Sequence, residues 1–298
     1  NRWLYYLTKS HPFLEIGAAE MFGAGGQKRV PESYIKNFRL GIPLKQEQAQ
    51  IANFLDYKTS QVDHLIRKKI ALIDKLIEQR ISVITQAVTK GLNPSTQMKD
   101  SEVAWLGEVP EHWGVKRLKF AIVFQRGHDL PASEREEGDI PLVSSAGISS
   151  SHSVSKAVAP GIVTGRYGTI GKFTYVDEDY WPLNTTLYSV DTVGNDVRFL
   201  WYMLHNLADL FVMNSKKSAV PGIDRNDLHS ELTAIPPLEE QKAIVEHLNL
   251  RLEKIDGMIT LNQQTIEKLE EYRTALITAA VTGKIDVRNV EIPEQDAV

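Results

Sequence analysis

The chain has 298 residues, of which 42% are hydrophobic and 24% are charged, with a formal net charge of -4 at pH 7. This is a globular composition with room for about two domains, and the net charge argues against a simple polybasic nucleic-acid-binding protein. The absence of cysteine excludes disulfides and thiolate sites, and no run reaches the roughly 18 apolar residues of a membrane span, so we expect a cytoplasmic protein without membrane contact.

The first segment, residues 1–41, carries three more basic than acidic side chains and begins at Asn1 rather than at a methionine. Its opening phrase, "NRWLYYL", resembles "VRFLWYM" at residues 197–203, a shift of 196 positions. The segment is therefore interpreted as the end of a larger unit that the chain contains a second time.

Residues 42–93 predict one long helix. The phrase "GIPLKQEQAQI" opens it with a proline and then acidic and amide residues, which suit a first turn because a carboxylate there complements the positive end of the helix dipole. Gly91 closes it, and glycine suits a C-terminal cap. Between them, positions at the 3-4 spacing of a heptad seam are mostly apolar, and Lys69 and Arg80 interrupt them. The seam comprises Val62, Ile66, Lys69, Ile73, Leu76, Arg80, Val83 and Ala87.

A linker at residues 94–104 leads to a segment of different character at 105–234. Short β-branched and aromatic runs such as "IPLVSS", "GIVTG", "GKFTYV" and "LYSV" alternate there with Gly, Pro, Asn and Asp turns. The stretch "VRFLWYMLHNLADLF" that follows predicts one buried helix. We expect a compact α+β domain of mixed short strands and helices.

This domain contains one phrase that superficially resembles a phosphate-binding loop, "GRYGTIGKFTYV" at 165–176. A P-loop needs a glycine five residues before its Gly-Lys pair and a Ser or Thr after it, and those positions hold Arg166 and Phe173. The glycines are better explained by hairpin turns. The eight histidines lack ligand spacing, and no G-x-S-x-G is present, so no catalytic, cofactor-binding or metal-binding residue is expected.

Residues 235–286 repeat residues 42–93 at a shift of 193 without a gap, and 18 of the 52 positions are identical. The second helix therefore starts at "IPPLEEQKAIV", ends near Gly283, and is followed by a tail at 287–298. Glu240 and Gln241 match Glu47 and Gln48, which favours a role in the first helical turn over half of a nuclease E-x-K motif. The second seam comprises Ile255, Ile259, Asn262, Ile266, Leu269, Arg273, Leu276 and Ala280.

The matching interruptions of the two seams favour two helices that pair with each other, because a polar seam residue can fix the register of a coiled coil. The alternative is that each helix lies separately on a domain and its polar tips reach water. About 37 helical residues would span about 55 Å. The first copy would lack roughly its leading hundred residues, so that residues 1–41 would be the C-terminal part of a first variable domain.

This alternation closely resembles the specificity (S) subunit of type I restriction-modification systems. The resemblance covers essentially the whole chain and is carried by "WLGEVPEHW" (105–113), "IPPLEEQKAIV" (235–245), "ITQAVTKG" (84–91) and "ITAAVTGK" (277–284). It implies target-recognition domains that each read half of a split sequence in double-stranded DNA, and two conserved helices paired as an antiparallel coiled coil. Methylation (M) subunits would dock on these helices.

The resemblance also implies a subunit without catalysis. S-adenosylmethionine would be bound by M, and ATP and Mg would be bound by partner subunits that include the restriction (R) subunits. The chain would be a fragment, or a half-subunit that pairs with a second copy. A coiled-coil scaffold without a DNA role and a stand-alone nuclease or nucleotide hydrolase remain alternatives.

The residues expected to contact DNA are polar and basic side chains on the loops of the second domain. Because residues 105–234 carry four more acidic than basic side chains, local patches or partner subunits must neutralise the phosphates. The predicted DNA-binding residues are Arg166, Tyr167, Lys172, Asn184, Thr185, Lys216, Lys217, Ser218 and Arg225.

Overall fold

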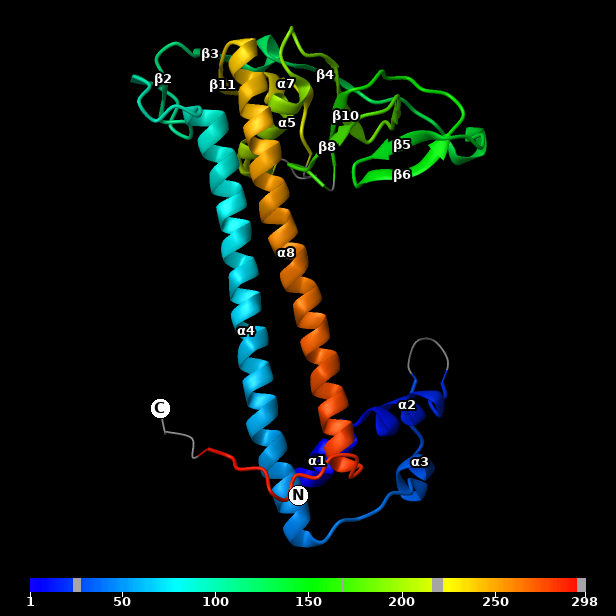
Figure 1. The fold of residues 1–298 in the computed structure, drawn as a ribbon. Helices are drawn as coiled ribbons and strands as arrows, with labels where there is room; N and C mark the ends of the chain where they lie inside the picture. Colours follow the sequence, from blue (N-terminus) through cyan, green and yellow to red (C-terminus); the bar gives the residue numbers. More distant parts are fainter. Residues whose placement is uncertain (24–27, 168, 216–221, 294–298) are drawn as a thin grey trace. The chain divides into compact units, whose positions relative to one another are not determined.

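The longest elements of the computed structural model are two helices, α4 (Lys45–Lys90) and α8 (Leu238–Val281), shown in Figure 1. The structure describes residues 1–23, 28–167, 169–215 and 222–293. Glycine follows each helix in the left-handed region, with φ of +74° at Gly91 and +72° at Gly283, as the sequence predicts. The helices hold 46 and 44 residues rather than about 37, because their amide- and carboxylate-rich first turns are helical too.

The two helices form a coiled-coil-like pair. The seam positions have low exposure on both, whereas neighbouring apolar side chains such as Leu65 and Ile70 are exposed. Arg273 forms an ion pair with Asp63 of α4, while Asn262 turns its amide to the carbonyl of Met258 on its own helix. The buried seam residues are Val62, Ile66, Leu76, Ala87, Ile255, Asn262 and Ala280; the half-buried ones are Lys69, Ile73, Arg80, Val83, Ile259, Ile266, Leu269, Arg273 and Leu276.

The chain divides into two compact units, and each long helix contributes to both. The first unit combines Asn1–Ile77 with Ile255–Val298. The division therefore cuts across the predicted segments 42–93 and 235–286. Besides its parts of the long helices, the described residues of the first unit form three short helices, α1 (Arg2–Thr8), α2 (His11–Ala19) and α3 (Glu32–Asn37).

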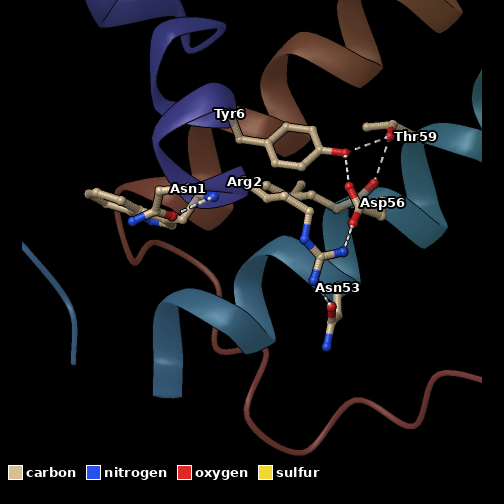
Figure 2. Close-up of polar contacts among 8 residues, drawn as sticks. Asn1, Arg2, Tyr6, Asn53, Asp56 and Thr59 are labelled. Carbon is tan, nitrogen blue, oxygen red and sulfur yellow. Dashed lines mark hydrogen bonds and ion pairs between the residues drawn. The ribbon is translucent and has the colours of Figure 1, made fainter. Parts of the chain in front are cut away.

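In the first unit, α1 packs on the start of α4 and the end of α8. The Tyr6 hydroxyl donates to Asp56 at 2.7 Å and lies 3.2 Å from the Thr59 hydroxyl, and Arg2 pairs with Asp56, as Figure 2 shows. Because the start of one long helix meets the end of the other, the pair is antiparallel. The apolar core here comprises Trp3, Tyr6, Leu7, Ile51, Phe54, Leu55, Ile277, Ala280, Val281 and Val287.

The second unit, Glu78–Lys254, contains the strands. A four-stranded sheet has the order β4-β10-β7-β8, a three-stranded sheet has the order β6-β5-β9, and two pairs, β1-β2 and β11-β3, complete the set. The strands are β1 (Met98–Asp100), β2 (Glu108–Pro110), β3 (Gly114–Arg117), β4 (Val123–Arg126), β5 (Ile140–Ser144), β6 (Gly147–His152), β7 (Gly161–Gly165), β8 (Phe173–Val176), β9 (Trp181–Pro182), β10 (Thr186–Asp191) and β11 (Leu232–Ile235).

The helices of the second unit correct one prediction. The stretch predicted as one helix forms two, α5 (Val197–Asn206) and α6 (Ala208–Ser215), separated at the fully buried Leu207. The largest fully buried side chains of the unit include Trp113, Phe124, Tyr180, Phe199 and Phe211. The remaining short elements are α7 (Arg225–Ser230) and the 3-10 turns η1 (Leu118–Phe120) and η2 (Ala132–Glu134).

Equivalent residues of the two sequence copies make equivalent bonds. Tyr202 of α5, the counterpart of Tyr6, donates to Asn249, the counterpart of Asp56, at 2.8 Å. The Nε2 atoms of Gln48 and Gln241 each donate at 2.9 Å to the carbonyl of the proline five residues earlier. The matched glutamines therefore close the first turn of each long helix.

The repeated phrases "ITQAVTKG" and "ITAAVTGK" lie where each long helix meets a short helix of the other sequence copy. Thr278 accepts a hydrogen bond from the backbone N–H of His11 at 2.9 Å within the first unit. Its counterpart Thr85 donates to Asn206 at 2.8 Å within the second. Each unit thus combines the start of one copy's long helix with the end of the other's, which explains why the phrase occurs twice.

Among the described residues, no helix is both long and apolar enough to cross a membrane.

Candidate nucleic-acid interface

Four chain segments of the second unit meet beside the ends of its strands. They are residues 127–131 after β4, the turn at 145–146 between β5 and β6, the loop that joins β7 to β8, and the turn at 183–185 between β9 and β10. The backbone N–H of His128 donates to the carbonyl of Pro182 at 2.8 Å, and that of Gly127 to the carbonyl of Thr186 at 3.0 Å. Backbone bonds therefore fix the first and last segments against each other.

Gly127 is required for this approach. A Cβ at this position would overlap the carbonyl oxygen of Leu183, so the backbone of one of the two segments would have to shift. Glycine here allows two backbone segments of the chain to lie in contact, as it does wherever backbones pack closely. The segment that holds Asp129 is thereby held beside the segment that holds Asn184.

Arg166 and Tyr167 extend from the end of β7. The N–H of Arg166 donates to the carbonyl of Thr185 at 2.9 Å, and its carbonyl accepts from the N–H of Ile223 at 2.9 Å. Its guanidinium carbon lies 5.1 Å from the centre of the half-exposed Tyr167 ring, a cation-π contact. These backbone hydrogen bonds hold Arg166 in place, and its guanidinium stacks on the ring of Tyr167.

Lys172 joins the same loop to the turn between β5 and β6. Its Nζ donates to the carbonyl of Ala146 at 3.0 Å, and the Thr169 hydroxyl donates to the carbonyl of Ser145. Gly171, with φ of +82°, supplies the turn that leads into β8. Lys172 is exposed, so its ammonium group has further donors for an anionic ligand.

The turn at 183–185 and the segment after β4 carry a chain of polar contacts. Asn184 donates through Nδ2 to the carboxylate of Asp129, which lies 3.8 Å from the guanidinium of Arg126. Beside them is a cavity of about 450 Å³. Its lining includes Asp129, Arg135, Ser144, Ser145, Asn184 and Thr185.

Beneath this surface, burial favours the neutral forms of Tyr188 and His229. Burial raises the pKa of Tyr188, whose hydroxyl lies 3.1 Å from Nε2 of His128. Burial, followed by the charge of Arg225, lowers the pKa of His229, whose Nε2 accepts from the N–H of Phe124 at 2.9 Å. A neutral ring is needed for that bond, because a protonated imidazole has no acceptor.

Comparison with known proteins identifies the family. The model described as "Type I restriction modification DNA specificity domain" matches residues 110–271, which is more than half of the chain and includes all four segments. The chain belongs to this family. The matched residues cover the second unit from β3 onward and most of α8.

The most similar curated specificity subunits include two from Methanocaldococcus jannaschii. The MjaVIII subunit is 25% identical across 89% of this chain and 66% of its own length, and the putative MjaX subunit is 23% identical across 89% and 63%. The EcoBI specificity subunit of Escherichia coli is 31% identical across 30% of this chain and 19% of its own length. The chain thus spans just under two thirds of the length of the Methanocaldococcus relatives.

Solved structures share the fold. A chain from a study of complex assembly and conformational transition of the type I R-M system superposes with a TM-score of 0.77 at 17% identity, over 96% of this chain and 73% of that one. The HsdS subunit of Thermoanaerobacter tengcongensis gives 0.56 at 17% identity, over 95% and 70%. The α+β domain and the two long helices are therefore a known arrangement.

Five of the nine predicted DNA-binding residues lie on the meeting segments. These are Arg166, Tyr167, Lys172, Asn184 and Thr185. Arg225 is exposed on α7, two residues after Ile223, which bonds to Arg166. Lys216, Lys217 and Ser218 lie outside the described residues.

Three residues of the same surface were not predicted from the sequence: Arg126, Asp129 and Arg135. Their signal was weak, because "GHDLPASER" at 127–135 reads as an ordinary loop. The residues of the E-x-K phrase lie elsewhere in the unit, where Glu240 contacts Nε2 of His112 at 2.7 Å and the buried Gln241 bonds to Asn195 and Pro236. Their contacts fit the predicted role in the first turn of the helix.

Proposed function

We propose that this chain is a DNA sequence-recognition subunit of a type I restriction-modification complex and that the four meeting segments of its second unit contact the DNA. The observation that carries the proposal is that cationic, aromatic and amide side chains of the loop between β7 and β8 and of the turn between β9 and β10 lie on one surface inside the matched specificity domain, where backbone hydrogen bonds hold the segments together. Arginine, lysine and asparagine are the residues that most often bind phosphates and base edges. The chain reads a site and performs no catalysis.

The partners of the chain in this proposal are double-stranded DNA, M subunits and R subunits. S-adenosylmethionine, ATP and Mg are bound by those subunits, and the complex acts in the cytoplasm. Partner subunits also supply cationic contacts to phosphates, which compensates for the net negative charge of residues 105–234.

The M subunits dock on the long helices. Exposed apolar side chains on α4, away from the seam, support this, because contiguous exposed apolar surface marks interaction sites. They include Leu65, Ile70, Leu72 and Ile77 of the first unit.

The recognised sequence is bipartite, and the helices set the spacing between its halves. At about 1.5 Å per residue, helices of 46 and 44 residues are roughly 65 to 70 Å long. This length corresponds to about two turns of DNA, taking about 34 to 36 Å per turn. The second unit reads one half-site.

Methylome sequencing of cells with the gene intact, deleted and restored tests the proposal. The gene should add one methylated motif that disappears on deletion. Restoration with Arg166→Ala and Lys172→Ala together should weaken or lose methylation at that motif. The matched control, Arg117→Ala with Lys119→Ala, removes the same two charges from exposed positions of the same unit and should restore the motif. A methylome that does not depend on the gene contradicts the proposal.

A further inference from the structure

One amide side chain on the proposed DNA surface has a fixed orientation. Asn184 lies in a turn whose flanking residues are bonded on both sides: the N–H of Leu183 donates to the carbonyl of Val143 at 2.9 Å, and the N–H of Thr186 donates to the carbonyl of Leu183 at 2.9 Å. The carbonyl of Thr185 accepts from Arg166. Backbone hydrogen bonds therefore hold the turn that carries Asn184 against β5 and against the residue that follows β7.

The amide plane is fixed as well. Asn184 Nδ2 donates to Asp129, and a carboxylate only accepts hydrogen bonds. The flipped amide would place Oδ1 against the carboxylate oxygen, so the orientation follows from chemistry. One N–H of the amide is used, and one N–H and the oxygen remain. Among the described residues, no hydrogen bond to that oxygen is found.

This remaining pair, one donor beside one acceptor, matches the major-groove edge of adenine. Adenine offers N7 as an acceptor and its N6 amino group as a donor. Guanine offers two acceptors at the same positions, so its O6 would face the amide oxygen. The cytosine and thymine edges each offer a single hydrogen-bonding group there.

The acidic neighbour does not exclude DNA from this position. Asp129 is exposed, and Arg126 lies 3.8 Å from the same carboxylate oxygen that accepts from Asn184. The guanidinium offsets the carboxylate charge near phosphates. Arg135 lines the adjoining cavity and adds a second cation.

We propose that Asn184 is a specificity-determining residue that reads one adenine of the recognised half-site through N7 and N6, with Asp129 as the positioning residue that holds its amide. The inference rests on the proposed function and adds the base that one side chain reads.

The first experiment compares the methylated motifs of cells that carry the wild-type chain, Asn184→Ala, Asp129→Asn or the control Asn226→Ala, an exposed asparagine of α7 outside the cavity. Asn184→Ala should relax one A·T position of the motif and leave the other positions unchanged. Asp129→Asn should relax the same position less, because an amide partner accepts either orientation of Asn184. Asn226→Ala should leave the motif intact.

The second experiment needs no variant, so it holds even if Asn184→Ala fails to fold. The purified wild-type complex methylates duplexes that carry the motif, in which each adenine other than the methylated base is replaced in turn by 7-deazaadenine or by a purine without the N6 amino group. At one of these adenines both replacements should lower the methylation rate at limiting enzyme by about tenfold, within the roughly ten- to hundredfold discrimination of a bidentate pair.

The outcomes separate the two proposals. A wild-type chain that directs methylation to no defined sequence overturns the proposed function and this inference with it. A defined motif that Asn184→Ala leaves unchanged overturns the inference alone, as does relaxation at a G·C position. Equal rates on adenine and on both analogues at every adenine other than the methylated base also overturn it.

Discussion

The two compact units share the contacts between their short helices and the long helices, and they differ in what packs on the outer faces of the short helices. In both, a short helix carries a tyrosine whose hydroxyl bonds to the long helix of its own sequence copy, at Asp56 in one unit and Asn249 in the other. In both, a threonine from the end of the other long helix bonds to the adjoining short-helix region. The outer faces of the short helices differ. Leu4 of α1 is 50% exposed, whereas its counterpart Leu200 of α5 is fully buried.

The contacts that the two units share form a common scaffold, and the elements that differ carry the proposed DNA recognition. Most of the positions identical in the two copies bury side chains or close helix turns, and these recur because the same packing is made twice. The strands and loops that carry the proposed DNA contacts occur in the described part of the second unit. Substitutions at equivalent positions should therefore have equal effects on stability, and substitutions on the loops should have unequal effects on recognition.

The largest effect is expected from the matched core leucines. Leu55 and Leu248 occupy equivalent positions and are both fully buried. Replacing either by alanine should lower the free energy of unfolding by about 2–5 kcal/mol, because a cavity remains. Urea unfolding of each variant measures this, with the exposed Leu65→Ala as the control near zero. If one of the two core variants were neutral, the units would not share a scaffold.

A smaller effect on stability, but a larger one on recognition, is expected from Gly127→Ala. The new Cβ would push the segment after β4 away from Leu183, at a cost of about 1–3 kcal/mol for an overpacked site. The shift would separate Asp129 from Asn184, so the methylated motif should become degenerate while the chain remains folded. Gly114→Ala, where a Cβ would meet open space, is the matched control. An unchanged motif with Gly127→Ala would show that the two segments do not act together.

The matched tyrosines give a further comparison, and one of them adds a pH dependence. Burial raises the pKa of Tyr6 to about 12, while the Thr59 hydrogen bond opposes the rise and Asp56 adds to it. The folded chain therefore holds this proton more tightly than the unfolded chain, whose tyrosines titrate near their ordinary value of 10.0. The contribution to stability is fully present below pH 10 and is lost as the pH rises toward 12.

Tyr6→Phe and Tyr202→Phe should each lower the free energy of unfolding at pH 7 by about 0.5–1.5 kcal/mol, the usual net value of a hydrogen bond. Tyr6→Phe should also flatten the fall in stability between pH 10 and pH 12. Unfolding curves at pH 7, 10 and 11.5 test both statements. A wild-type chain that is as stable at pH 11.5 as at pH 10 would contradict the alkaline part.

The smallest effect is expected at the threonines of the repeated phrase. Thr85→Val and Thr278→Val keep the shape and remove one hydrogen bond each, at partly exposed sites, so we expect at most about 1 kcal/mol from either. Thermal unfolding of the two variants side by side measures the difference. A loss at Thr85 alone would mean that the two helix ends dock differently.

Much of the fold could be predicted from the sequence because its signals are local. The heptad seam, the prolines before the long helices and Gly91 and Gly283 after them act within a turn or two of the chain. The run "GIVTG" coincides with β7. The break at Leu207 was missed because the apolar pattern continues through it, and the chain turns there where Asn206 meets Thr85 of a distant helix.

The candidate site was less predictable because its contacts join residues that are far apart in the sequence. Arg166, Tyr167 and Lys172 could be selected by residue type on an inferred loop. The pairing of Asp129 with Asn184 joins residues 55 positions apart and depends on the contact of two backbones at Gly127. A glycine in a loop does not by itself say which segment it approaches.

Hydrogen-deuterium exchange of the purified complex, with and without a duplex that carries its methylated motif, tests the central claim most directly. The account predicts slower amide exchange on adding the duplex in residues 127–131, 144–147, 166–172 and 183–185, and unchanged exchange in α1 and along the buried seam. Protection elsewhere in the chain, with those four segments unaffected, would contradict it.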